Sequence, residues 1–282
     1  MRRSIGCCIA IGIGLLISGA AFGEAVDPLG VLFQYQWIGN IDQTKFVEPS
    51  GITLHKDRGT LFVVSDEGYI EEIQRDGTPV QQQLIRKADF EGVTSDPSTG
   101  LLYLAIEGEE KIIEVNPDDF SVTREFVIDR TFQGRTVLKK GGQGIECIAF
   151  VPDANHPEGG TFYVGNQSFD LADSEDLSAI FEVEVPLRSR GAGEPTATII
   201  RYLAPGVIDL SGIHHDKASD HLYVISDATN TLLEMTRAGE VLRAFAFPGQ
   251  NQEGIAVDEN GNVFVAQDSG GIVKMKWDAY GK

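Results

Sequence analysis

Gln252-Glu253-Gly254-Ile255-Ala256-Val257, followed by the turn Asp258-Glu259-Asn260-Gly261, is the stretch of sequence that decides the fold. The apolar segments Val263–Ala266 and Ile272–Lys276 come directly after it. Aromatic and β-branched residues separated by Asp, Asn and Gly are typical of short strands joined by tight turns. The segment therefore predicts a β-hairpin with a third strand beside it.

The same opening occurs five times along the chain. It consists of an acid or a serine, then a glycine, then a β-branched residue, and cysteine replaces the glycine in the third copy. The five copies are Ser50-Gly51-Ile52, Glu91-Gly92-Val93, Glu146-Cys147-Ile148, Ser211-Gly212-Ile213 and Glu253-Gly254-Ile255. Each is followed by a second and a third apolar strand, and a repeat of this length predicts a propeller or a solenoid.

A fourth, more polar strand is expected in the first four repeats, whereas the fifth repeat ends near Trp277. Leu32–Ile38 lies before the first repeat and is a suitable fourth strand for the last one. Pairing of this segment with Ile272–Lys276 would close a ring and cover its exposed strand edges. The sequence therefore predicts an all-β fold, a five-bladed β-propeller closed by an N-terminal strand.

The two middle spacings between openings are longer than the outer ones, which indicates insertions at Asp129–Gln143, Gln167–Leu177 and Arg188–Glu194. A six-bladed ring is the alternative if these insertions contain a further blade, although no sixth opening is present.

The N-terminus has the layout of a secretory signal peptide. Arg2 and Arg3 precede the apolar run Ile5–Ala21, and Ala21-Phe22-Gly23 provides small residues for cleavage. We expect a signal peptide over residues 1–23, a single propeller domain over residues 24–282, and a location in the periplasm or outside the cell. The alternative is an uncleaved segment that anchors the protein to the cell membrane.

The formal net charge of −19 disfavours binding to nucleic acid or to anionic lipids. Cys147 is the only cysteine after the signal, so the domain has no internal disulfide and its core depends on packing. We expect a monomer with a protein or small-molecule ligand of unknown identity at one face of the propeller.

The residues before the four glycines and Cys147 form a ring if the first strand of each blade lines the channel. Three of them are acids: Glu91, Glu146 and Glu253. Converging carboxylates either take up protons or bind a cation, and hard oxygen ligands without His or Cys favour calcium. The alternative is that these glutamates accept hydrogen bonds from backbone amides and bind nothing.

Two further polar sets recur in each repeat. The first lies two residues before the ring and contains Glu48, Asp89, Gly144, Asp209 and Asn251; the second follows the second strand and contains Asp66, Glu107, Gln167, Asp227 and Asp268. Turn formation explains such residues as well as ligand binding does. The metal ligands expected from the sequence are Glu91, Glu146, Glu253, Asp89, Asp209 and Glu48.

Other signals for chemistry are weak. His214-His215 ends a first strand and is expected to be a surface pair, although it could supply a base or a ligand. Neither a GxSxG motif, nor a phosphate-binding loop, nor an HExxH motif is present.

The segments Phe90–Thr94, Gly144–Ala149, Asp209–Ile213 and Gln252–Val257 resemble the SdiA-regulated (YjiK-like) family of bacterial β-propellers, which is distantly similar to NHL-repeat propellers. The resemblance covers Phe33 to Trp277 and implies five blades and calcium binding, without an established biochemical role. Cys147 departs from the family pattern, which leaves Glu91 and Glu253 as the firmest acids of the channel.

Two functions remain open at this point. One is a calcium-stabilised binding or scaffold module, which needs only the acidic channel and variable loops. The other is a metal-dependent hydrolase of a lactone or a phosphoester, in which the ion polarises the substrate or activates water. The sequence identifies no catalytic base among the repeated acids, so whether the protein is an enzyme is left undecided.

Overall fold

The structure is a computed structural model that describes residues 33–173, 175–189, 195–278 and 280. The expected signal peptide, residues 1–23, lies outside the described residues. The regular elements within them are strands, and no helix there has the length and apolar character needed to cross a membrane.

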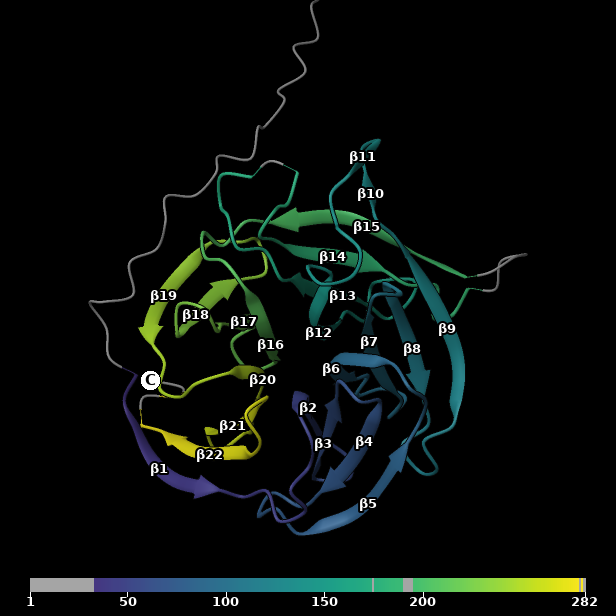
Figure 1. The fold of residues 1–282 in the computed structure, drawn as a ribbon. Helices are drawn as coiled ribbons and strands as arrows, with labels where there is room; N and C mark the ends of the chain where they lie inside the picture. Colours follow the sequence, from purple (N-terminus) through teal and green to yellow (C-terminus); the bar gives the residue numbers. More distant parts are fainter. Residues whose placement is uncertain (1–32, 174, 190–194, 279, 281–282) are drawn as a thin grey trace, which may run out of the picture.

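Four-stranded antiparallel groups stand around a common centre, which is the arrangement of a β-propeller (Figure 1). Three groups are separate sheets. In two of them the chain runs from the innermost to the outermost strand, whereas in the third the outermost strand comes from the N-terminal part of the chain. They consist of β2 (Pro49–His55), β3 (Thr60–Ser65), β4 (Tyr69–Ile73) and β5 (Pro79–Leu84); β16 (Leu210–Asp216), β17 (His221–Ser226), β18 (Thr231–Thr236) and β19 (Val241–Ala246); and β20 (Gln252–Val257), β21 (Asn262–Gln267), β22 (Ile272–Trp277) and β1 (Tyr35–Asn40).

The remaining two groups join into one eight-stranded sheet through a parallel pair between β9 and β15, in which Ala197 lies opposite Ile128. Their strands are β6 (Asp89–Ser95), β7 (Leu102–Glu107), β8 (Lys111–Val115) and β9 (Val122–Asp129), then β12 (Ile145–Pro152), β13 (Gly160–Asn166), β14 (Ile180–Glu184) and β15 (Thr196–Leu203). A short hairpin of β10 (Thr131–Phe132) and β11 (Arg135–Thr136) lies in the first expected insertion. The sequence did not indicate the parallel pair.

The N-terminal strand closes the ring, as expected. β1 pairs antiparallel with β22, with Tyr35 opposite Trp277 and a register shift between Trp37 and Gly39. Trp277 is buried among the rings of Phe33, Tyr223 and Phe245, the last two of which belong to the preceding group of strands. The two ends of the chain are therefore held together by both ladder hydrogen bonds and aromatic packing.

The hydrophobic core lies between successive groups of strands and not within a single centre. One cluster contains Tyr103, Phe150 and Phe162 and fills the space between β7 and the β12–β13 hairpin. Another joins the last group to the first through Ile52, Ala256 and Phe264. Because middle strands such as β3 and β7 are packed on both faces, they are almost continuously apolar, which explains their sequences.

Candidate functional site

A β-bulge lies near the start of every innermost strand, and it defines the ring at the centre of the propeller. In each ladder one residue of the inner strand is skipped by the pairing register: Ser50, Glu91, Glu146, Ser211 and Glu253. These are the residues expected to line the channel. A bulge leaves its extra residue without a cross-strand partner and re-aims its side chain, so five equivalent bulges create one ring of related positions.

Glycine follows the bulge because neighbouring inner strands approach each other at backbone distance. A Cβ atom on Gly51 would lie 2.7 Å from the Cα atom of Gly92, and one on Gly254 would lie 2.7 Å from the amide nitrogen of Ile52. No side chain fits at such distances without displacing backbone. The repeated glycine is thus a packing requirement of the narrow centre.

Cys147 occupies the equivalent position in the third group and is accommodated differently. It lies opposite Gly165 in the ladder, and its Sγ atom is 3.3 Å from the carbonyl oxygen of Leu210. Burial raises the pKa of the Cys147 thiol, so it remains protonated and packs as a small apolar group. The bulge at Glu146 is retained despite the missing glycine.

Three carboxylates meet at the start of the channel. Oxygen atoms of Asp66, Asp89 and Glu91 all lie within 4.8 Å of one another, and all three side chains are partly buried. They come from the end of β3 and the start of β6, which are neighbouring groups of strands. The hydroxyl of Ser50 donates a hydrogen bond to Asp66, so the ring serine also takes part.

The electrostatics of this cluster disfavour three negative charges. Burial, assisted by the charges of Asp89 and Asp268, raises the pKa of Asp66 to about 6. Burial and the charges of Glu146 and Asp66 raise the pKa of Glu91 well above its usual range. A cation held by these oxygens would relieve the repulsion and return the groups to the ionised form.

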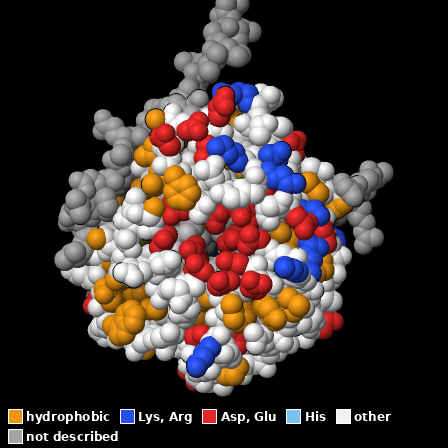
Figure 2. All heavy atoms as spheres, viewed as in Figure 1, with side chains coloured by type: hydrophobic (Ala, Val, Ile, Leu, Met, Phe, Trp, Pro, Cys, Tyr) orange, Lys and Arg blue, Asp and Glu red, His pale blue; other side chains and the backbone are white. Residues whose placement is uncertain are grey.

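The other ring acids are subject to the same burial and repulsion around the channel. Burial, with the charges of Glu107 and Glu253, raises the pKa of Glu146 to about 9. Burial, with the charges of Asp227 and Asp209, raises the pKa of Glu253 to about 8. Figure 2 shows acidic side chains gathered around the central opening of this face. We call this opening the acidic mouth and define it by Asp66, Asp89, Glu91, Glu146 and Glu253.

The remaining expected ligands are placed differently. Asp209 has a φ of 57°, and its carboxylate accepts a hydrogen bond of 2.9 Å from the amide of Ala228, which is turn chemistry. Burial nevertheless raises the pKa of Asp209. Glu48 is exposed with a φ of 47°, and its carbonyl oxygen accepts a hydrogen bond from Ser50. Neither belongs to the three-carboxylate cluster.

Asp66 is the residue that the expected ligand set omitted. Its sequence position, directly after a second strand, gave equal support to a turn and to a ligand. Within the same recurrent set, the carboxylate of Asp227 accepts a hydrogen bond of 2.8 Å from the amide of Gln252, and Glu107 accepts one of 3.1 Å from Gly144. Equivalent positions therefore differ in their contacts: Asp227 and Glu107 accept hydrogen bonds from backbone amides at or just before the start of a neighbouring strand, whereas Asp66 lies in the three-carboxylate cluster.

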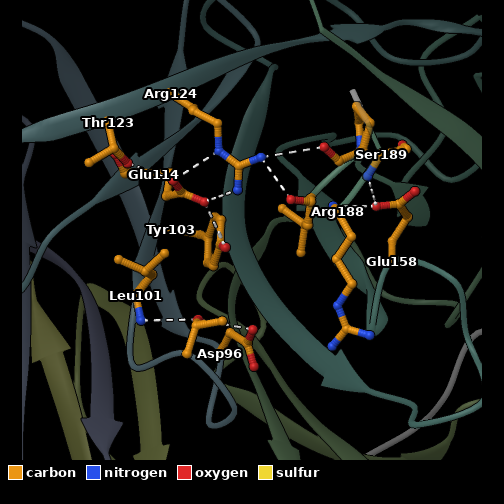
Figure 3. Close-up of polar contacts among 12 residues, drawn as sticks. Asp96, Leu101, Tyr103, Glu114, Thr123, Arg124, Glu158, Arg188 and Ser189 are labelled. Atoms are coloured by element: carbon orange, nitrogen blue, oxygen red, sulfur yellow. Dashed lines mark hydrogen bonds and ion pairs between the residues drawn. The ribbon is translucent and has the colours of Figure 1, made fainter. Parts of the chain in front are cut away.

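A set of acids on the third strands differs from the acids of the channel, because each forms an ion pair with an arginine. Glu114 accepts hydrogen bonds from Thr123 at 2.6 Å and from Tyr103 at 3.0 Å, and it forms an ion pair with Arg124 (Figure 3). Although burial opposes it, hydrogen bonding from Arg124 lowers the pKa of Glu114. Comparable pairs join Glu72 to Arg58 and Glu234 to Arg243. These carboxylates stabilise the fold, whereas those of the acidic mouth have no arginine partner among the residues that the structure describes.

His214 and His215 are not the surface pair that the sequence predicted. The Nε2 atom of His215 lies 2.9 Å from Asp220. Both histidines are partly buried. His214 stacks on Tyr223, and burial lowers the pKa of His214 to about 4, so it is neutral. It lies far along β16 from the ring residue Ser211, on the wall of a separate cavity.

Comparison with known proteins gives one family and several solved folds. The model of the SdiA-regulated family matches residues 35–270. No curated protein matches the chain. The crystal structure of Myxococcus xanthus glutaminyl cyclase aligns with a TM-score of 0.57 at 13% identity, over 86% of this chain and 95% of that one.

Two further structures are similar at lower scores. A streptogramin B lyase aligns with a TM-score of 0.49 at 14% identity, over 86% of this chain and 98% of that one. The Cps50 (Swd1) β-propeller domain of Myceliophteria thermophila has a TM-score of 0.43 at 10% identity, over 82% of this chain and 65% of that one. At these identities the likeness concerns the fold.

Proposed function

The chain belongs to the SdiA-regulated family, and from this premise we propose that it is an exported, calcium-binding β-propeller that acts as a binding or scaffold module. The observation that carries the proposal is the convergence of Asp66, Asp89 and Glu91 within 4.8 Å. The ligand that the module binds is unknown; we place it at one face of the monomeric propeller and do not expect nucleic acid.

The propeller in this proposal has five blades. Dividing the eight-stranded sheet at its parallel β9–β15 pair gives two groups that match the other three in strand order. Each group begins with a bulge, and each bulge contributes one ring residue. The inserted segment between β9 and β12 contains only the short β10–β11 hairpin among its strands, which argues against a sixth blade there.

Calcium is the cation that these residues suit best. The cluster offers carboxylate oxygens, and neither histidine nor cysteine belongs to it. Calcium prefers oxygen ligands and tolerates irregular geometry, whereas zinc favours nitrogen and sulfur. Burial raises the pKa values of Asp66 and Glu91, and among the described residues no lysine or arginine offsets this effect. Among the ring acids, Glu253 and Glu146 would add longer-range attraction.

A metal-dependent hydrolase of lactones or phosphoesters is the second candidate. Calcium takes six to eight oxygen ligands, and the cluster provides three side chains, which leaves positions for water or substrate. The chemistry that such an ion supplies is polarisation of a carbonyl or phosphoryl group. Glu253 has a pKa raised to about 8 by burial and neighbouring acids, so it is suited to accept and return a proton near neutral pH.

Isothermal titration calorimetry of the purified protein with calcium chloride tests the proposal, after removal of metals with EDTA. We expect one saturable site for calcium and a much weaker response to magnesium. Absence of calcium binding would refute both candidates. If calcium binds, a panel of lactones and phosphoesters separates them: turnover that requires calcium and Glu253 would favour the hydrolase.

Export is proposed from the sequence of residues 1–23. The mass of the protein recovered from the periplasm or the medium should correspond to a chain that begins at Glu24. Recovery of the uncleaved chain in the membrane fraction would instead support the anchored form.

A further inference from the structure

A second concave site lies at the end of the channel opposite the acidic mouth. It is a cavity of about 560 Å³, within the range of small-molecule sites. The ring residues stand near the starts of the innermost strands, whereas the cavity is lined by later residues of the same strands and by the turns that follow them. None of the acidic-mouth residues lines this cavity.

The floor of the cavity is apolar. The residues directly after the ring glycines, or after Cys147, all line it, and all are β-branched and buried: Ile52, Val93, Ile148, Ile213 and Ile255. They also separate the cavity from the acidic mouth, because they lie between the two along every inner strand. Phe150 and Val257 extend the apolar wall. The bottom of the cavity therefore favours a hydrocarbon or aromatic group.

The acids at the rim of this cavity are all engaged by hydrogen bonds or ion pairs. Asp216 accepts hydrogen bonds from the hydroxyls of Tyr280 at 2.9 Å and Ser219 at 2.6 Å. Asp258 and Glu259 both pair with the guanidinium of Arg75, at 3.2 and 2.8 Å. Each of the three carboxylates therefore has a donor group bound to it, although Arg75 balances only one of their negative charges.

Two lysines at the same rim have no ion-pair or hydrogen-bond partner for their ammonium groups among the described residues. Lys56 and Lys217 lie in the turns after β2 and β16, and both line the cavity and are exposed. Among the described residues no hydrogen bond or ion pair engages either ammonium group, whereas Lys111 and Lys139 form ion pairs. The rim of the cavity thus has three basic and three acidic side chains, and among the described residues its two lysines are the charged groups that have no partner.

We propose that this cavity binds a small amphipathic anion, whose apolar part contacts the five β-branched residues and whose carboxylate or similar group lies between Lys56 and Lys217. The neutral imidazole of His214, partly buried on the cavity wall, offers a further hydrogen-bonding group. This site goes beyond the calcium-binding function, because it uses the opposite end of the channel and none of the acidic-mouth residues.

Ligand charge provides the first test. Octanoate and octylammonium have the same apolar chain and opposite charge, and their binding to the purified protein can be compared by ligand-observed NMR and calorimetry. A net charge of −19 attracts cations without specificity, so a preference for octanoate can only come from a local site. We expect octanoate to bind more tightly, with affinity rising about fourfold per added CH₂ from butanoate to octanoate.

Variants provide the second test. Lys56→Gln with Lys217→Gln should lower octanoate affinity tenfold or more, while the exposed pair Lys45→Gln with Lys87→Gln, outside the cavity, leaves it unchanged. Glu91→Gln should not change octanoate binding, which separates this site from the calcium site. The proposal is overturned if octanoate does not bind, if octylammonium binds as well, or if the Lys56 and Lys217 variant binds octanoate normally.

Discussion

Cys147 and Gly165 lie opposite each other in the β12–β13 ladder, and each residue determines the size that the other can have. A Cβ atom on Gly165 would lie 2.5 Å from the Sγ atom of Cys147. In the other four groups the position of Cys147 is glycine. The third group therefore accepts a larger residue on its inner strand because the neighbouring strand carries a smaller one.

This relationship predicts that Gly165→Ala destabilises the protein by about 1–3 kcal/mol through overpacking. Cys147→Gly should suppress most of that loss, because it removes the sulfur atom from the clash. Chemical denaturation of the two single variants and the double variant measures the coupling. Additive effects of the two substitutions would show that the sulfur atom is not the obstacle.

Replacement of single acids should separate the calcium ligands from the rest of the negative surface. Asp66→Asn removes one oxygen donor from the cluster, and we expect calcium affinity to fall tenfold or more, as measured by calorimetry. Asp57→Asn, at an exposed position outside the cluster, removes the same charge and is the matched control. Equal losses in both variants would mean that only net charge matters.

The pair Glu91→Gln and Glu253→Gln should lower calcium affinity further while the metal-free protein still folds. Burial raises the pKa of both Glu91 and Glu253. The neutral side chain of glutamine therefore resembles the protonated form that each glutamate adopts without metal. Circular dichroism in EDTA checks the fold, and calorimetry checks the binding. Unchanged calcium binding in this double variant would remove the ring from the metal site.

Glu71 provides a pH-dependent prediction at a distance from the acidic mouth. It is fully buried, Thr44 donates to Oε2 at 3.0 Å, and among the described residues Oε1 has no hydrogen-bond partner. Burial raises the pKa of Glu71 from 4.5 to about 7. The folded protein therefore retains a proton that the unfolded chain releases, and stability falls as the pH rises from about 4.5 through 7.

Glu71→Gln should remove this loss, because the glutamine stays neutral. We expect the variant to be more stable than the parent by about 1–3 kcal/mol at pH 8, with little difference at pH 4. Thermal unfolding of both proteins across this range measures the effect, and the other acids cancel in the comparison. An advantage of the same size at every pH would contradict a titration origin.

The two tryptophans test ring closure, because they lie on paired strands in opposite environments. Trp277 is 2% exposed and packs on Phe33, whereas Trp37 is 58% exposed. Trp277→Ala should destabilise the protein by about 3–5 kcal/mol, and Trp37→Ala by less than about 0.5 kcal/mol. Denaturant unfolding followed by circular dichroism measures both. Similar values would indicate that β1 does not close the ring.

Much of the fold could be predicted because every repeat has the same local pattern of residue types. The opening at Gly254 is dictated by backbone crowding, and the apolar runs are dictated by burial on both faces, so both reappear in every group. The closing strand could be predicted because the last repeat lacked one. The β9–β15 pair could not, because a parallel contact between two polar edge strands leaves no periodic signal.

The candidate site could be predicted only in part. Glu91 and Asp89 share one strand with the repeated opening, and the sequence identified both. Asp66 belongs to the preceding group, and only the geometry shows that it meets them while Asp227 caps a turn. The cavity at the other end was not predicted. Its apolar floor consists of residue types that also form an ordinary hydrophobic core, and its two lysines are far apart in the chain.

Because of the parallel pair between β9 and β15, the contacts between neighbouring groups of strands are not the same all around the disk of the propeller. Hydrogen bonds of the backbone cross between neighbouring groups there, while the other groups form separate sheets among the described strands. The eight strands of this sheet, β6–β9 and β12–β15, should therefore exchange amide hydrogens as one cooperative block. When heat or force opens the disk, the break should occur where only side chains meet, and partly opened molecules should keep this block intact as a template onto which the rest refolds.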